Sequence, residues 1–142
     1  MESNEAKTST LTPFELYNIE CLEGWHSLIQ PILDYVKEYN EDKEVDNRIA
    51  ILQIKEKWGS LRIYTNFVTD ELGKLIETAE AESVKVCEKC GTREHVGTKH
   101  DGWRMTLCKK CVQDLANEDK RTHIWCENCG DRSYAIEPTS LP

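Results

Sequence analysis

Two Cys-x2-Cys pairs constrain the fold of this chain most strongly. The pairs are Cys87/Cys90 and Cys108/Cys111, and seventeen residues separate them. Four thiolates in two such pairs are typical of a closed tetrahedral zinc site, in which each Zn–S bond is about 2.3 Å long. Cysteines that are merely buried do not need this spacing. The sequence therefore predicts one structural zinc ion held by Cys87, Cys90, Cys108 and Cys111.

The residues around these pairs predict a treble clef over residues 87–117. Gly91 directly follows Cys90 and permits a tight turn, a knuckle, in which backbone amides point at the thiolates. Segment 107–116 has apolar residues at helical spacing, so we expect a helix that carries the second pair in its first turn. A knuckle, a hairpin and a ligand-bearing helix in this order make a treble clef.

A third pair, Cys126/Cys129, is followed by Gly130 and predicts a second knuckle over residues 123–132. Two thiolates cannot close a tetrahedral site, so this pair needs further ligands. The two missing ligands would come from a second subunit or from among four residues of this chain: Cys21, His95, His100 and His123.

Three ways of sharing the ligands remain open. In the favoured one, the first two pairs hold one zinc ion, and Cys126, Cys129 and His123 hold a second ion with His95 or His100. Alternatively, the second and third pairs share one ion and leave the first pair with His95 and His100. In the third arrangement the last pair is free or redox active. The first is favoured because it keeps the treble-clef order.

The sequence before the cysteines predicts a small core over residues 11–84. Apolar residues recur at helical spacing from Phe14 to about Asn40, with breaks at Gly24 and Pro31, and residues 48–57 and 60–67 read as two antiparallel strands joined at Gly59. Another helix, capped by Thr69 or Asp70, leads into the first knuckle. The expected fold is α+β: a helix-plus-hairpin core, a treble clef and a C-terminal zinc knuckle within residues 85–136, with a flexible leader at 1–10 and a tail at 137–142.

Finer expectations concern individual core positions. In the first strand, Ile49, Ile51 and Gln53 are expected on one face, with Leu52 and Ile54 on the other. Cys21 has no partner cysteine nearby, so it is interpreted as a small buried hydrophobe rather than a ligand.

Composition excludes several classes of protein. No apolar run is long enough to span a bilayer, and the acidic, polar start is unlike a signal peptide, so we expect a reducing cytoplasm, where cysteines serve metals rather than disulfides. The net charge is −8, and residues 1–84 carry 17 acidic against 8 basic residues. Residues 85–136 are only mildly basic, with 10 basic against 8 acidic residues, which disfavours non-specific nucleic-acid binding.

The sequence carries four spaced motifs: Glu23-Gly24-Trp25, the stretch 53–64 (QIKEKWGSLRIY), Cys87-x2-Cys90-Gly91 and the stretch 101–108 (DGWRMTLC). They resemble those of a family of small uncharacterised bacterial and phage zinc-finger proteins. The resemblance covers about residues 20–112. Members often have Cys-x2-His where this chain has Cys108-x2-Cys111. The resemblance implies the core fold and the first zinc site, but no activity, and the knuckle at 126–130 looks like an addition.

The leading functional hypothesis is a non-enzymatic, zinc-stabilised module that binds a protein, which for a phage-encoded chain would be a host or defence protein. Candidate contacts are Trp25, Trp58, Trp103 and Arg104, because large rings beside turns and glycines either fill a small core or anchor a partner. The acidic N-terminal part favours a basic partner surface. The partner could also be a second copy of the chain, which would make the protein a homodimer.

Two alternative functions are compatible with parts of the sequence. Nucleic-acid binding would use the basic residues of the finger region: Lys85, Lys89, Arg93, Lys99, Arg104, Lys109 and Lys110. A metal-dependent nuclease is suggested by a faint similarity of His100-Asp101, followed by the second cysteine pair, to His-Me finger endonucleases. The interval between the pairs is short for that class, and Val112 stands where those enzymes commonly carry asparagine. A base, a metal ligand and an orienting residue should all be present, so an enzyme is disfavoured.

Overall fold

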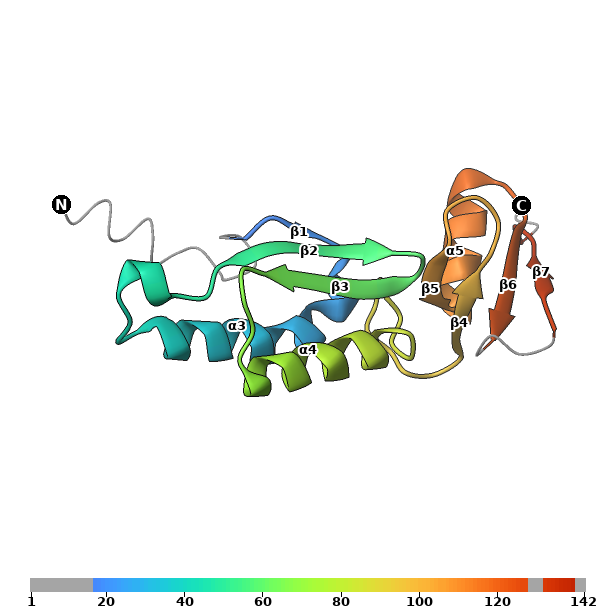
Figure 1. The fold of residues 1–142 in the computed structure, drawn as a ribbon. Helices are drawn as coiled ribbons and strands as arrows, with labels where there is room; N and C mark the ends of the chain where they lie inside the picture. The colour runs from blue at the N-terminus through green and yellow to red at the C-terminus, as the bar shows by residue number, and fades with distance from the viewer. Residues whose placement is uncertain (1–16, 128–131, 140–142) are drawn as a thin grey trace.

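The computed structural model describes residues 17–127 and 132–139. Over these residues the chain has an α+β fold with two small antiparallel or mixed sheets, each packed on helices (Figure 1). In chain order the elements are β1 (Ile19–Glu20), η1 (Glu23–Trp25), α3 (His26–Asn40), η2 (Val45–Asn47), β2 (Ile51–Lys57), β3 (Ser60–Thr65), α4 (Asp70–Ser83), β4 (Val96–Lys99), β5 (Met105–Cys108), α5 (Lys109–Asp119), β6 (His123–Glu127) and β7 (Tyr134–Ile136).

The N-terminal core consists of the sheet β1-β2-β3 with α3 and α4 against one face (Figure 1). The hairpin β2–β3 and the helix α4 confirm the sequence prediction. Thr69 caps α4, since its hydroxyl accepts a hydrogen bond from the Leu72 amide at 3.0 Å. Helix α3 runs without interruption through Pro31. The core that these elements enclose contains Trp25, Ile29, Ile32, Leu33, Val36, Ile49, Ile54, Leu61, Ile63, Leu72, Ala79 and Val86.

Two local expectations in this core were wrong. Residues 19–20 form a strand parallel to β2 rather than part of a helix, because Ile19 pairs with Ile54 of the central strand. Leu52 and Ile54 were expected on one face, but Leu52 is 65% exposed and Ile54 only 1%. A register shift between Ile51 and Gln53 explains this difference, since a bulge rotates the following side chains relative to those before it.

The C-terminal part is built around a second sheet of strand order β5-β4-β6-β7, against which α5 packs. The β4–β5 hairpin and α5 follow the first knuckle as expected. Strands β6 and β7 were not predicted, because only the cysteine pair was read from that segment. Residues 128–131, which include Cys129 and Gly130, lie outside the described part of the chain.

Residues of η1 connect the N-terminal core to the first knuckle. Trp25 is fully buried, and its indole Nε1 donates to the Val86 carbonyl at 2.8 Å. The prediction that Trp25 contacts a partner is therefore wrong: its ring fills the core and fixes the chain just before the first knuckle. Gly24 donates its amide to the Glu88 carbonyl at 2.7 Å. The knuckle is thus mounted directly on the N-terminal core.

Among the described residues, no helix is long and apolar enough to cross a membrane.

Candidate metal centre

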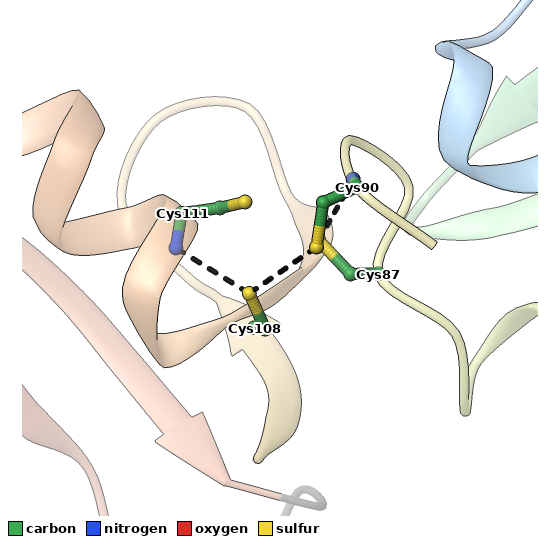
Figure 2. A group of neighbouring side chains, drawn as sticks. All are labelled: Cys87, Cys90, Cys108 and Cys111. Atoms are coloured by element: carbon green, nitrogen blue, oxygen red, sulfur yellow. Dashed lines mark hydrogen bonds between the residues drawn. The ribbon is translucent and has the colours of Figure 1, made fainter. Parts of the chain in front are cut away.

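Four cysteines come together at the boundary between the two parts of the fold. The sulfur atoms of Cys87, Cys90, Cys108 and Cys111 all lie within 4.8 Å of one another (Figure 2). The Sγ atoms of Cys90 and Cys108 are 3.7 Å apart. Sulfurs of a tetrahedral site with Zn–S bonds of about 2.3 Å are about 3.8 Å apart, so the cluster has the dimensions of a four-thiolate metal site.

Each pair sits on a backbone turn suited to holding thiolates. In the knuckle, the Gly91 amide donates to the Cys87 carbonyl at 2.9 Å, and Gly91 has a φ of 82°, a left-handed conformation that favours glycine. The amide of Cys90 also points at the Cys87 sulfur, at 3.5 Å. Figure 2 shows the two pairs converging from the knuckle and from the start of α5.

The second pair lies at the N-terminus of α5, as predicted. Cys108 is the N-cap residue, and its sulfur accepts a hydrogen bond from the Cys111 amide at 3.4 Å. Amides at a helix start carry partial positive charge and stabilise a thiolate there. Both turns therefore supply N–H donors to sulfurs that carry negative charge when a metal is bound.

The thiols of the cluster perturb one another. Burial, followed by the neighbouring cysteines, raises the pKa of Cys111, and burial is also the main reason why the pKa of Cys108 is raised. Burial acts in the same direction on Cys90, but hydrogen bonds with the Thr92 backbone and with the other cysteines outweigh it and lower its pKa. Four sulfurs so close together repel one another as thiolates, and a divalent cation among them offsets that repulsion.

The knuckle is pressed against η1 without room for side chains. A Cβ atom at Gly24 would lie 2.2 Å from the Cys87 carbonyl oxygen. Glu88, between the two cysteines of the first pair, is buried and accepts the Leu22 amide at 3.1 Å. Burial raises its pKa to about 7. The Gly-Trp motif is thus explained by packing: glycine leaves room for the knuckle, and tryptophan anchors the turn at Val86 that leads into it.

His123 does not face Cys126, the member of the third cysteine pair that the structure describes. Side chains alternate along β6, so His123 and Cys126, three residues apart, point to opposite faces of the strand. Both ring nitrogens of His123 also contact carboxylates: Nδ1 lies 2.7 Å from Asp101 Oδ2 and Nε2 lies 2.8 Å from Asp119 Oδ2. The assignment of His123 as a ligand of a second zinc ion is therefore corrected. His123 is a buried bridge between two acidic groups.

The other expected ligands of a second zinc ion are not gathered either. Cys126 is buried in β6, and Cys129 lies outside the described residues. His95 is exposed, with Nδ1 3.2 Å from Glu127 Oε2, and His100 is exposed as well. Within residues 17–127 and 132–139, the four cysteines of the first two pairs are the only cluster with metal-binding geometry.

Cys21 behaves as the sequence suggested. It is half-buried and packs against the N-terminal core. Burial, with the nearby carboxylates of Glu88 and Glu56, raises its pKa to about 12. A thiol with so high a pKa is a poor nucleophile at neutral pH.

Asp101, named in the nuclease hypothesis, is engaged in holding a loop. Its Oδ1 accepts the Ile124 amide at 2.7 Å while Oδ2 contacts His123. Burial works to raise the pKa of Asp101, but these hydrogen bonds and the nearby Lys99 ammonium outweigh it, so its pKa lies below the usual value. The carboxylate therefore organises the segment 100–104 that joins β4 to β5.

This segment carries Trp103 to the tip of the β2–β3 hairpin. Lys99 Nζ donates to the carbonyls of Asp101 and Trp103 at 2.6 and 3.1 Å, and Trp103 Nε1 donates to Glu56 Oε1 at 2.9 Å. Beneath it, the hydroxyl of Thr106 in β5 donates to the Gly59 carbonyl. Sequence reasoning missed Glu56 and Thr106, because neither residue type is distinctive and their contacts join segments 47 residues apart.

Trp58 occupies the hairpin turn in a rare backbone conformation. Trp58 and Gly59 have φ angles of 56° and 84°, which define a two-residue turn of the type that favours Asn-Gly. A residue with a side chain costs about 1–2 kcal/mol in this left-handed region. The indole is nevertheless 71% exposed and Trp103 is 69% exposed, so neither ring contributes much to a core.

A cleft of about 640 Å³ lies between the hairpin turn and the segment 100–104, and its lining includes Trp58, Trp103 and Arg104. The structure thus brings together three of the four predicted partner contacts and places the fourth, Trp25, in the core. The cysteine cluster can hold a metal ion that braces β5 and α5, and hence the loop that presents Trp103. Comparisons with protein-family models, with curated proteins and with solved structures find no match to this chain.

Proposed function

We propose that the protein is a zinc-stabilised, non-enzymatic module that binds another protein. The metal proposed for the four-cysteine site is zinc, because four thiolates at this spacing in a small domain suit a closed tetrahedral site. Its role is structural: all four positions around the ion are taken by protein ligands, which leaves none for a substrate. The knuckle, the β4–β5 hairpin and α5 support interpreting this unit as a treble clef.

The observation that carries the binding proposal is the exposure of Trp58 and Trp103 at one cleft. Large aromatic rings are usually buried, and exposed ones near each other are typical anchors of protein interfaces. Trp58 also holds an unfavourable turn conformation that Asn would adopt more easily. A large ring that stays exposed in an unfavourable backbone conformation does not stabilise the fold, and this supports a role in binding.

The zinc proposal is tested by metal analysis of the purified chain together with native mass spectrometry. We expect at least one zinc ion per chain, and one fewer in Cys108→Ser. A chain that purifies without metal, or a Cys108→Ser variant with unchanged zinc content, would contradict the assignment. Native mass spectrometry also reports whether the chain is a homodimer.

The binding proposal is tested by affinity capture with the full zinc-loaded chain as bait, followed by cross-linking and mass spectrometry. We expect a protein that is captured by the wild-type chain and lost with Trp103→Ala, and cross-links from the cleft. Zinc-loaded, folded bait that captures no protein would contradict the proposal. Magnesium-dependent cleavage of DNA or RNA that disappears in His100→Ala would show that the protein is an enzyme instead.

The resemblance to small bacterial and phage proteins enters here as a proposal: a member of that family encoded by a phage would meet a host or defence protein. Nucleic-acid binding is kept as a second candidate, because cationic side chains of Lys55, Lys57 and Arg104 line the same cleft. The net charge of −8 weighs against it.

A further inference from the structure

We propose that the cleft between the hairpin turn and the segment 100–104 binds a short acidic peptide segment that carries a large apolar side chain. This inference rests on the proposed protein-binding function and names the chemistry of the partner at that surface. The cleft is lined by Glu20, Lys55, Glu56, Lys57, Trp58, Gly102, Trp103 and Arg104. Its volume of about 640 Å³ is within the range of specific ligand pockets and suits one or two side chains with their backbone.

The two indoles supply the apolar contact, and the ring of Trp103 and the turn that carries Trp58 are held in place before any ligand arrives. Trp103 is fixed at its ring by the hydrogen bond to Glu56 and at its carbonyl by Lys99. Trp58 stands on a tight turn whose carbonyl at Gly59 accepts a hydrogen bond from Thr106. Preorganised rings lose little conformational freedom on binding, which favours their use as anchors for an apolar side chain.

The charges of the cleft select an acidic ligand. Within the described part of the chain, Lys55, Lys57 and Arg104 form no ion pair, and Lys55 lies over the Tyr64 ring with Nζ 5.9 Å from its centroid. The Glu56 carboxylate is already engaged, because its two oxygens accept the Gly59 amide at 2.6 Å and the Trp103 indole at 2.9 Å. Three cations therefore line the cleft against the two carboxylates of Glu20 and Glu56, and the lining keeps a net charge of +1 that favours an acidic ligand.

The surroundings limit the length of that ligand. Residues 1–84 carry 17 acidic against 8 basic residues, so a long anionic chain that leaves the cleft meets repulsion from the rest of the surface. This disfavours a polynucleotide, whose backbone is charged at every step. The sequence also has no glycine-rich phosphate loop. A short acidic stretch within an otherwise basic or neutral protein satisfies both the cleft and the acidic surface.

The test is selection of a random dodecapeptide display library on the full zinc-loaded chain. We expect enriched peptides to combine two or more Asp or Glu residues with Trp, Phe or Leu. Selection on the charge-reversed variant Lys57→Glu/Arg104→Glu should shift enrichment to basic peptides. Enrichment of peptides without an acidic bias, the same peptides on both baits, or no enrichment at all would overturn the inference.

Trp58→Asn separates binding from folding, since Asn-Gly is the preferred sequence of this turn. The melting temperature of this variant should equal or exceed that of the wild type, while the affinity for a selected acidic peptide, measured by fluorescence anisotropy, falls about thirtyfold or more. Val45→Ala, which alters an equally exposed apolar residue in η2 outside the cleft, is the matched control and should leave the affinity unchanged. Unchanged affinity in Trp58→Asn would contradict the assignment.

Two further experiments distinguish a failure of this inference from a failure of the proposed protein-binding function. A captured protein that still binds Trp58→Asn and the charge-reversed variant would leave protein binding intact and overturn only the cleft. A single-stranded dodecathymidylate that binds with Trp58-dependent affinity and displaces the peptide would reassign the cleft to nucleic acid.

Discussion

At the scale of residues, the chain separates its tryptophans into two uses. Trp25 and Trp125 are buried and donate their indole N–H groups to the carbonyls of Val86 and Leu107. Trp58 and Trp103 are exposed beside one cleft. The sequence could not distinguish these uses, because the buried Trp25 and the exposed Trp58 and Trp103 all stand next to a glycine, and only the folded chain shows what each ring contacts.

His123 gives the first test at this scale. Removing its ring in His123→Ala leaves the carboxylates of Asp101 and Asp119 facing each other without the group that bridges them, and a buried charge that loses its partner typically costs about 3–5 kcal/mol. Because both carboxylates are partly exposed, we expect a smaller loss of about 2 kcal/mol in the free energy of unfolding at pH 7, measured by urea denaturation.

The same variant distinguishes the structural role of His123 from the ligand role predicted earlier. Zinc content per chain should be unchanged in His123→Ala, because the ring nitrogens face carboxylates and not the cysteine cluster. Loss of a zinc ion from this variant would restore His123 as a ligand.

At the scale of elements, the sequence predicted the features that neighbouring residues determine and missed those that depend on pairing between distant segments. The β2–β3 hairpin, the Thr69-capped helix α4 and the cysteine-bearing start of α5 follow from periodicity, caps and turn residues, and all three are present. Strand β1 is only two residues long and exists because it pairs with β2, which no local pattern encodes. The bulge that exposes Leu52 is likewise set by pairing between strands.

The four cysteines of the metal site were predicted correctly for a related reason. Ligand pairs close in sequence and turns marked by glycine are local signals, and the treble-clef order favoured joining the first two pairs over the two other arrangements. The packing of the knuckle on η1 could not be predicted, since it depends on the contact of Gly24 with residues more than sixty positions away.

That contact gives a prediction for the junction of the elements. Gly24→Ala should destabilise the fold by about 2–4 kcal/mol, because its Cβ would overlap the carbonyls of Cys87 and Glu88, which are backbone atoms and cannot rotate away. Thermal and urea denaturation of the zinc-loaded protein measure the effect.

Gly73→Ala in α4 is the matched control. A Cβ at Gly73 meets nothing within 4 Å, and alanine is favoured over glycine inside a helix, so this variant should gain up to about 1 kcal/mol. Equal stabilities for the two variants would show that the knuckle does not pack on η1 as described.

At the scale of the whole molecule, the described residues form two adjacent hydrophobic cores. The larger core lies between the first sheet and helices α3 and α4, and the smaller core contains Cys87, Cys108 and Cys111 together with Trp125. A smaller core is less able to hold its fold unaided, and small domains commonly depend on a metal for this reason. The metal site therefore matters most to the C-terminal part.

This asymmetry predicts how the protein responds to a chelator. Stripping the metal at neutral pH should remove hydrogen-exchange protection from β4, β5 and α5, while the amides of α3 and the β2–β3 hairpin remain protected. Exchange measured by mass spectrometry, with and without zinc added back, checks this. Uniform loss of protection would mean that the two cores unfold as one unit, and unchanged protection would mean that the metal is not structural.

The turn at Trp58 has a consequence for anyone who evolves this protein in the laboratory. A screen that rewards only heat resistance should accept Asn or Gly at this position early, because either residue relaxes the backbone there. Under the proposed function, a population selected in that way would gain heat resistance and lose its grip on the partner, and the positions that changed first would mark the surface used for recognition.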